Sequence, residues 1–296
     1  MKKEYTGPMR LAHRGLVQYA PENTLGAFEA ALDHGFEGIE IDVQLSGDGE
    51  VIVAHDPNFT RMTLGSPTNP SNRRIREMTV AEIQAIDIPY ANHLLPRALP
   101  PHTEVESMAI MPSRLMGQES GSDYIDALRR DRRMTHLMTF AEFDAWFSTR
   151  GERALIEIEV KAPGMMPRLA AILNASPNVD RYVLFSGVPE YLEEMQGYCA
   201  EHGRPGGIRL GANLRQVNEQ TLAFVDRADL YEVGLNDQCF GPDEVRLFAD
   251  RGIRVFSNLG DYPGWWEKLA ESGCMAFKTN YAEAYTDWWE ARDRRP

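Results

Sequence analysis

The sequence predicts a single (β/α)8 barrel, a TIM barrel, spanning all 296 residues. Short runs rich in β-branched residues alternate with amphipathic runs of helical spacing, which is typical of a largely parallel sheet. The main alternative is a doubly wound open sheet, which predicts a GxGxxG loop after the first strand. The segment found there is HRGLVQYAPENT, which lacks that loop. The length also suits a barrel of about 250 residues plus an insertion.

Strands are predicted at Met9–His13, Gly38–Gln44, Val51–Ala54, Ala154–Val160, Tyr182–Phe185, Ile208–Gly211, Leu230–Val233, Arg254–Ser257 and Met275–Lys278. Helices are predicted at Thr24–His34, Val80–Asp87, Phe140–Thr149, Met166–Ala175, Glu190–His202, Glu219–Arg227, Asp243–Asp250, Trp265–Ser272 and Ala282–Arg292, with Thr24 as a cap for the first of them. The strands exceed the eight of a barrel by one. Val51–Ala54 is assigned to a hairpin arm, because Ser46-Gly47-Asp48-Gly49 before it favours a tight turn.

The segment 88–133 fits neither periodic pattern. It is rich in Pro, Met, His and Arg, and it is far longer than an ordinary connection in a compact domain. Because it follows the run that ends at His55, we expect it to emerge on the catalytic face as an insertion that forms a lid or small cap. A disordered excursion or a dimerisation arm is the alternative.

Composition narrows the choice of partners. The net charge of −13 disfavours non-specific nucleic-acid binding, which depends on neutralising phosphates. A small anionic substrate is compatible with this net charge if a metal and a few cations dominate the pocket.

No apolar run approaches the roughly 18 residues of a membrane span or resembles a secretory signal, so no stable membrane insertion and a cytoplasmic location are expected. Cys199, Cys239 and Cys274 form no CxxC pair and are predicted to be free thiols. The oligomeric state is left open.

Carboxylates repeat along two predicted strands. Alternate strand residues share a face, so Glu40 and Asp42 point one way in GIEIDV, and Glu157, Glu159 and Lys161 do so in LIEIEVK. Carboxylates inside a barrel are costly unless their charge is compensated. A divalent cation with oxygen ligands would compensate it, and Mg²⁺, Ca²⁺ and Mn²⁺ all suit such a site. Salt-bridged surface carboxylates are the alternative.

Two histidines end predicted strands, at His13 and His55. Catalytic groups of barrel enzymes lie at the C-terminal ends of the strands. Imidazole titrates near neutrality, so one histidine can take a proton from an attacking oxygen while the other gives one to a leaving oxygen. Arg14 and Asp56 follow the two histidines directly, which makes a purely structural role less attractive. The sequence does not assign which histidine is the acid.

Taken in order, these residues resemble the glycerophosphodiester phosphodiesterase family. The matching segments are His13-Arg14-Gly15, Pro21-Glu22-Asn23-Thr24, Glu40-x-Asp42-Val43, Asp48-Gly49, His55-Asp56 and Glu159-x-Lys161. The resemblance implies a TIM barrel that holds one divalent cation and hydrolyses a glycerophosphodiester to glycerol 3-phosphate and an alcohol. It implies metal ligands at Glu40, Asp42 and Glu159, an acid/base pair at His13 and His55, phosphate contacts from Arg14 and Lys161, and support from Glu22 and Asn23.

The chain also departs from the family pattern. Glu157 stands where the family more often has a small neutral residue, and Asn280 stands where it usually has aspartate. Phe256 and Lys278 are expected at the barrel mouth, where they would contact substrate, with Glu157 in a supporting role. They motivate an alternative in which the same chemistry acts on a sugar-phosphate diester or a lysophospholipid. An inactive phosphodiester-binding scaffold is the alternative of another class, which the retained histidines and carboxylates disfavour.

Overall fold

The structure is a computed structural model of the chain. It describes residues 8–63, 66–88, 135–150, 154–235, 241–258 and 260–293. Apart from Ile88, the predicted insertion lies outside the described residues, and so does Cys239. Cys199 and Cys274 are free thiols. Within the described ranges, no helix combines the length and apolarity needed to cross a bilayer.

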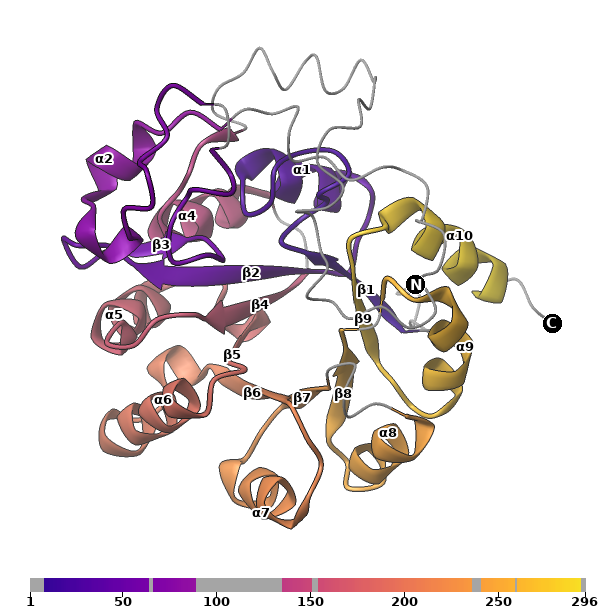
Figure 1. Ribbon diagram of the computed structural model, residues 1–296. Coiled ribbons are helices and arrows are strands. Elements are labelled where there is room, and N and C mark those ends of the chain that lie inside the picture. The colour runs from indigo at the N-terminus through magenta and orange to yellow at the C-terminus, as the bar shows by residue number, and fades with distance from the viewer. Residues whose placement is uncertain are drawn as a thin grey trace.

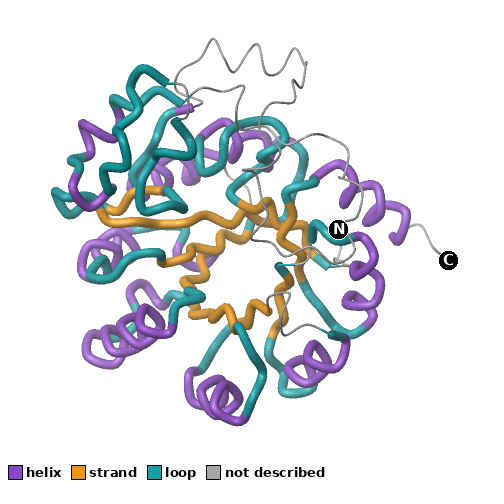
Figure 2. The backbone as a smooth tube through the Cα atoms, in the orientation of Figure 1, coloured by secondary structure: helices purple, strands orange, loops and turns teal. Residues whose placement is uncertain are grey.

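Eight parallel strands of the described chain close into a barrel, which is viewed along its axis in Figure 1. They are β1 (Met9–His13), β2 (Gly38–Leu45), β4 (Leu155–Val160), β5 (Tyr182–Phe185), β6 (Arg209–Leu214), β7 (Glu232–Leu235), β8 (Arg254–Ser257) and β9 (Ala276–Thr279). Strand β1 pairs in parallel with both β9 and β2, which closes the ring. Figure 2 shows that ring in orange. The barrel prediction is therefore confirmed, and the doubly wound alternative is wrong.

Helices surround the barrel on the outside (Figure 1). They are α1 (Leu25–Asp33), α2 (Val80–Gln84), α4 (Phe140–Arg150), α5 (Met166–Ala175), α6 (Pro189–His202), α7 (Glu219–Ala228), α8 (Pro242–Ala249), α9 (Pro263–Glu271) and α10 (Ala282–Asp293). Short 3-10 helices lie at Ile75–Glu77, Val179–Arg181 and Pro205–Gly207. Each barrel strand is followed by a helix, as the alternating sequence pattern predicts.

Strand β3 (Val51–Val53) is the predicted hairpin arm. It pairs antiparallel with Val43–Leu45 at the end of β2. The turn is closed by the Ser46 amide, which donates to the Glu50 carbonyl at 2.9 Å, and Gly49 adopts a φ of 85° there. That left-handed conformation favours glycine because it has no Cβ. The hairpin prediction is confirmed.

The outward faces of the strands form the main apolar core. Ile39, Ile41 and Val43 of β2 are fully buried in a cluster with helix residues such as Phe28 and Phe143. The rings of Phe28 and Phe143 meet edge to face at 5.1 Å. Burying one such side chain contributes roughly 1.5–3 kcal/mol. Glu40 and Asp42, which alternate with these residues along β2, therefore point into the barrel interior.

Three local predictions are wrong. Helix α2 ends at Gln84 rather than Asp87. Strand β7 begins at Glu232 rather than Leu230, because Asp229 adopts a left-handed conformation that ends the preceding helix and delays the strand. The Thr24 side chain makes no cap hydrogen bond to helix α1, since its hydroxyl donates to the Pro21 carbonyl at 2.6 Å.

Gly38 provides a test of packing inside the barrel. A Cβ at this position would collide with the Leu11 side chain and approach the Leu155 carbonyl oxygen to 2.9 Å. We expect Gly38→Ala to lower the free energy of unfolding by about 1–3 kcal/mol, measured by urea denaturation, because the close-packed interior must shift. Gly197→Ala is the control, because nothing lies within 4 Å of a Cβ there and a helix favours alanine by up to ~1 kcal/mol. Wild-type stability of Gly38→Ala would contradict the packing described.

Candidate active site

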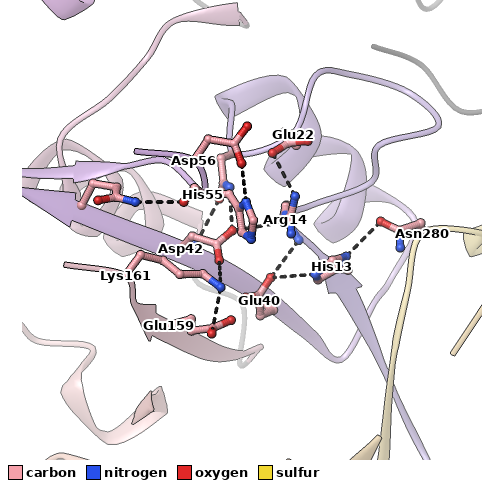
Figure 3. Close-up of polar contacts among 12 residues, drawn as sticks. His13, Arg14, Glu22, Glu40, Asp42, His55, Asp56, Glu159, Lys161 and Asn280 are labelled. Atoms are coloured by element: carbon pink, nitrogen blue, oxygen red, sulfur yellow. Dashed lines mark hydrogen bonds and ion pairs between the residues drawn. The ribbon is translucent and has the colours of Figure 1, made fainter. Parts of the chain in front are cut away.

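Three acidic side chains from β2 and β4 meet inside the barrel (Figure 3). Glu40 and Asp42 share the inner face of β2, and Asp42 is the register partner of Glu159 on β4. One carboxylate oxygen from each residue lies within 4.8 Å of the other two. Glu40 and Asp42 are buried, and Glu159 is partly exposed. The structure thus brings together the three predicted metal ligands.

The carboxylates carry opposed pKa shifts. Burial and the neighbouring Asp42 charge raise the pKa of Glu40 well above its usual range. Burial would also raise the pKa of Asp42, but the positive charges of His55, Lys161 and Arg14 outweigh it and lower that pKa. The Asp42 Oδ1 atom is buried without a hydrogen-bond partner. This oxygen has only the ion pair with Lys161 Nζ at 3.3 Å, and together with two further carboxylates it forms a donor set that fits a hard divalent cation.

Two cationic side chains lie against this cluster. The Lys161 Nζ atom is 2.8 Å from Glu159 Oε1 and 3.3 Å from Asp42 Oδ1. The Arg14 Nε atom is 3.3 Å from Asp42 Oδ2, and the Arg14 amide donates to Glu40 Oε2 at 3.1 Å. Arg14 adopts a φ of 58°, and this turn lets its amide and its guanidinium reach the same cluster. Both predicted phosphate-binding cations therefore stand at the carboxylates.

Asn23 positions Asp42. Its side-chain amide donates to Asp42 Oδ2 at 2.9 Å, and its oxygen accepts the Asp42 amide at 3.3 Å. The Asn23 backbone amide also donates to the Arg14 carbonyl at 2.9 Å. Asn23 has a φ of 56°, a conformation that asparagine tolerates better than most residues. The segment Pro21–Thr24 thus connects the turn after β1 to β2 through the hydrogen bonds of Asn23.

His13 lies at the end of β1, beside the carboxylates. Its Nδ1 atom is 3.0 Å from Asn280 Oδ1, and its Nε2 atom is 3.9 Å from Glu40 Oε2. Burial, followed by the positive charge of Arg14, lowers the pKa of His13 to about 3. The Nδ1 atom thus has a hydrogen-bond partner beyond β9, while Nε2 faces Glu40 of β2 at a distance too long for a hydrogen bond.

His55 is the more exposed of the two histidines. Its Nδ1 atom is 2.7 Å from Asp56 Oδ1, and its carbonyl accepts the Gln44 side-chain amide at 2.9 Å. Its charge acts on both Asp42 and His13, which places it at the same site. Hydrogen bonding to Asp56 orients the ring. His13 and His55, which the sequence predicts as an acid/base pair, both lie beside the carboxylates (Figure 3).

Arg61 is a site residue that the sequence reading missed. Its Nε atom donates to Asp56 Oδ2 at 2.8 Å, and its two terminal nitrogens each donate to Glu22 at 2.7 Å. Glu22 in turn accepts from Arg14 at 3.1 Å. One chain of charged contacts therefore joins His55 to Arg14. In the sequence, Arg61 is only an arginine five residues after Asp56. The sequence gives little sign of its role, because it meets Glu22 only in the folded chain.

Lys278 and Phe256 do not lie where the sequence suggested. Lys278 is 2% exposed, and its Nζ atom is 3.0 Å from Glu157 Oε1 and 4.2 Å from the centre of the Phe185 ring. Phe256 is fully buried in a cluster of inward apolar residues that includes Leu11. These placements do not support contact with substrate, because both side chains are enclosed by the barrel wall.

Glu157 is likewise an interior residue and has a second acid beside it. Glu232 of β7 is fully buried, and burial together with Glu157 raises its pKa well above the usual range. Burial also raises the pKa of Glu157, against the opposing effect of Lys278. Glu232 lies inside the strand predicted at Leu230–Val233, but a single carboxylate without an alternating partner gives no signal of its interior position. Glu157, Glu232 and Lys278 form an internal charge cluster next to the predicted metal ligands, because Glu157 is the register partner of Glu40 and the Lys278 charge acts on Glu40.

Fold and site together define a TIM barrel with a carboxylate cluster flanked by histidines and cations. The sequence model of the glycerophosphoryl diester phosphodiesterase family matches residues 13–283, and the chain belongs to this family. The glycerophosphodiester phosphodiesterase of Caldanaerobacter subterraneus is 40% identical over 77 residues, which are 26% of this chain and 29% of that protein. Glycerophosphodiester phosphodiesterase 1 of Rattus norvegicus is 36% identical over 90 residues, 30% of this chain and 25% of that protein. The chain thus matches less than a third of the length of these relatives.

Solved structures show the same fold. A phosphodiesterase of Oleispira antarctica, solved in complex with the product sn-glycerol-3-phosphate, superposes with a TM-score of 0.68 at 19% identity over 95% of this chain and 96% of that one. The glycerophosphodiester phosphodiesterase of Thermotoga maritima gives a TM-score of 0.63 at 19% identity over 96% of this chain and all of the other. At such identities the likeness extends to the fold alone.

The Arg61 contacts generate a test of the charged chain. Arg61→Lys keeps the charge but loses the planar fork that binds Glu22 with two nitrogens. We expect kcat for diester hydrolysis to fall about 10–100-fold, the range typical of groups that orient catalytic residues. Arg73→Lys is the matched control, because Arg73 pairs with Glu82 in an exposed ion pair. Equal activity of the two variants would show that the Arg61 contacts do not support the site.

Proposed function

We propose that the chain is a metal-dependent phosphodiester hydrolase that cleaves a glycerophosphodiester-like substrate to glycerol 3-phosphate and an alcohol. The observation that carries this proposal is the convergence of Glu40, Asp42 and Glu159 with two histidines in a barrel of this family. The substrate class follows from the family and from the names of its relatives. It is a small anionic diester, which suits a site flanked by Arg14 and Lys161.

Glu40, Asp42 and Glu159 would hold one divalent cation, Mg²⁺, Ca²⁺ or Mn²⁺. Their closeness supports this role, and so does the buried Asp42 Oδ1 atom without a hydrogen-bond partner. A bound cation supplies charge stabilisation for the phosphoryl oxygens. Carboxylate oxygens suit all three ions, so the ligand set alone does not choose between them.

Arg14 and Lys161 bind and orient the phosphate in this proposal. Each already neutralises a carboxylate of the cluster, and each is held by more than one contact. Fixed positive groups at a transferring phosphoryl centre stabilise the charge that develops there, and they need no reorganisation during the reaction. The hydrogen bond from the Asn23 backbone amide to the Arg14 carbonyl and the contact between Arg14 and Glu22 keep the turn at Arg14 in place.

The histidines move the protons. The oxygen of a water molecule, or of the adjacent glycerol hydroxyl, bonds to phosphorus while the bond from phosphorus to the alcohol oxygen breaks. One histidine accepts the proton of the attacking oxygen, and the other donates a proton to the departing alkoxide, so the charge balances. If the hydroxyl attacks, the resulting cyclic diester is opened by water in a second step. His13 and His55 are the pair that the site offers for these transfers.

The placements of Lys278 and Phe256 do not favour a sugar-phosphate diester or a lysophospholipid as the substrate. Lys278 and Phe256 are enclosed in the barrel interior, so neither supplies a specificity contact at the mouth. The remaining motive is the insertion 88–133, which lies outside the described residues. A glycerophosphodiester is therefore the substrate that the site and the family support best.

The histidine roles are tested with glycerophosphocholine. We expect His13→Ala and His55→Ala each to lower kcat for glycerol 3-phosphate release at least about a hundredfold, because each removes one proton transfer. His202→Ala is the control, because His202 is exposed at the end of helix α6. Full activity in either site variant would refute the assignment. No activity in wild type with any glycerophosphodiester would instead favour a binding scaffold.

Metal removal tests the carboxylates. We expect EDTA to abolish glycerophosphocholine hydrolysis, and Mg²⁺, Ca²⁺ or Mn²⁺ to restore it. Asp42→Asn should weaken cation binding by at least about tenfold in calorimetry, because an amide oxygen carries no charge to balance the cation. Glu193→Gln is the control, because Glu193 is an exposed residue of helix α6. Undiminished activity in EDTA would contradict the proposed role of the carboxylates.

A further inference from the structure

A second set of contacts reaches His13 from the side away from the carboxylates. Asn280, directly after β9, places its Oδ1 atom 3.0 Å from His13 Nδ1. The Asn280 side-chain nitrogen donates to Asp261 Oδ2 at 2.7 Å. Asp261 lies between β8 and helix α9. All three side chains are buried, with exposed fractions of 8% for His13, 3% for Asn280 and 6% for Asp261. Figure 3 shows the contact between His13 and Asn280.

The direction of each hydrogen bond is set by Asp261. Its Oδ1 atom accepts the Asn280 backbone amide at 2.7 Å and the Thr279 hydroxyl at 3.0 Å. Burial raises the pKa of Asp261, but three donors converge on its carboxylate and favour the ionised form. An ionised carboxylate only accepts hydrogen bonds, so the group of Asn280 that faces Oδ2 must be its NH₂. The amide oxygen of Asn280 is then left to face His13.

The orientation of that amide determines where the proton of His13 sits. An amide oxygen cannot donate, so the proton of neutral His13 must be on Nδ1 for the 3.0 Å contact to be a hydrogen bond. The lone pair is then on Nε2, the nitrogen that faces Glu40 Oε2 at 3.9 Å. Orientation of an imidazole through its second nitrogen is a general device for fixing a histidine tautomer.

We infer that Asp261 and Asn280 are positioning residues that fix His13 in the Nδ1–H tautomer, so that His13 exchanges its proton with substrate through Nε2. The catalytic consequence rests on the proposed function, but the tautomer does not. Asp261 touches neither histidine directly in this scheme and acts only through Asn280. The reading of the sequence passed over Asp261 because it lies in a connection, nineteen residues before its partner.

Asp261→Asn is the sharpest variant. The new amide would present its NH₂ to the Asn280 side chain, and two NH₂ groups cannot hydrogen-bond to each other. The Asn280 side-chain amide would therefore rotate by half a turn and point its NH₂ at His13. The ¹⁵N spectrum of His13 at neutral pH should then change from the Nδ1–H tautomer in wild type to the Nε2–H tautomer in the variant. With glycerophosphocholine, kcat should fall about 10–100-fold while KM stays within about twofold.

Thr279→Val is the matched structural control. It removes the other side-chain contact of Asp261 but leaves the Asn280 amide in place, so the tautomer of His13 should stay unchanged. An Nε2–H tautomer in wild type would overturn the inference, and that measurement depends on no variant. An unchanged tautomer in folded Asp261→Asn would overturn it as well. Because both spectra are recorded without substrate, they remain decisive even if the chain does not hydrolyse glycerophosphodiesters.

Discussion

Repulsion among the interior carboxylates is the constraint around which the site is organised. Glu40, Asp42 and Glu159 offer oxygens within 4.8 Å of one another, and two of these residues are shielded from water. At an effective dielectric constant of about 20, two unit charges ~4 Å apart repel by about 4 kcal/mol. Arg14 and Lys161 offset part of this repulsion, while burial and then the Asp42 charge still raise the pKa of Glu40. A divalent cation is the simplest further source of compensation.

The barrel makes such a crowded cluster possible because the outward-facing side chains of β2 and β4 are apolar. Ile39, Ile41 and Val43 commit β2 to one orientation, and a slip of one residue would turn the apolar set inward and both carboxylates outward. The apolar packing therefore stabilises an arrangement that electrostatics alone disfavours. Connections at the C-terminal ends of the strands then supply the cations and histidines, each held by a neighbour such as Asn23 or Arg61.

Sequence reasoning predicted the parts of this arrangement that depend on local pattern. Alternation placed Glu40 and Asp42 on one face, and turn residues identified the β3 hairpin. It failed where the contact is long-range or the burial cannot be read locally. Arg61 meets Glu22 across 39 residues, and Lys278 is enclosed because Glu157 of another strand pairs with it. Charged side chains usually indicate a solvated or functional position, so this internal pair was mistaken for part of the barrel mouth.

The proposed metal site can be located directly by diffraction. A crystal soaked in Mn²⁺ and measured for anomalous scattering should show one strong peak within about 2.0–2.6 Å of oxygens from Glu40, Asp42 and Glu159. A peak at these residues would establish that the interior carboxylates form a cation site. A well-occupied ion elsewhere, with the three carboxylates bound only by Arg14 and Lys161, would contradict the central role given to this cluster.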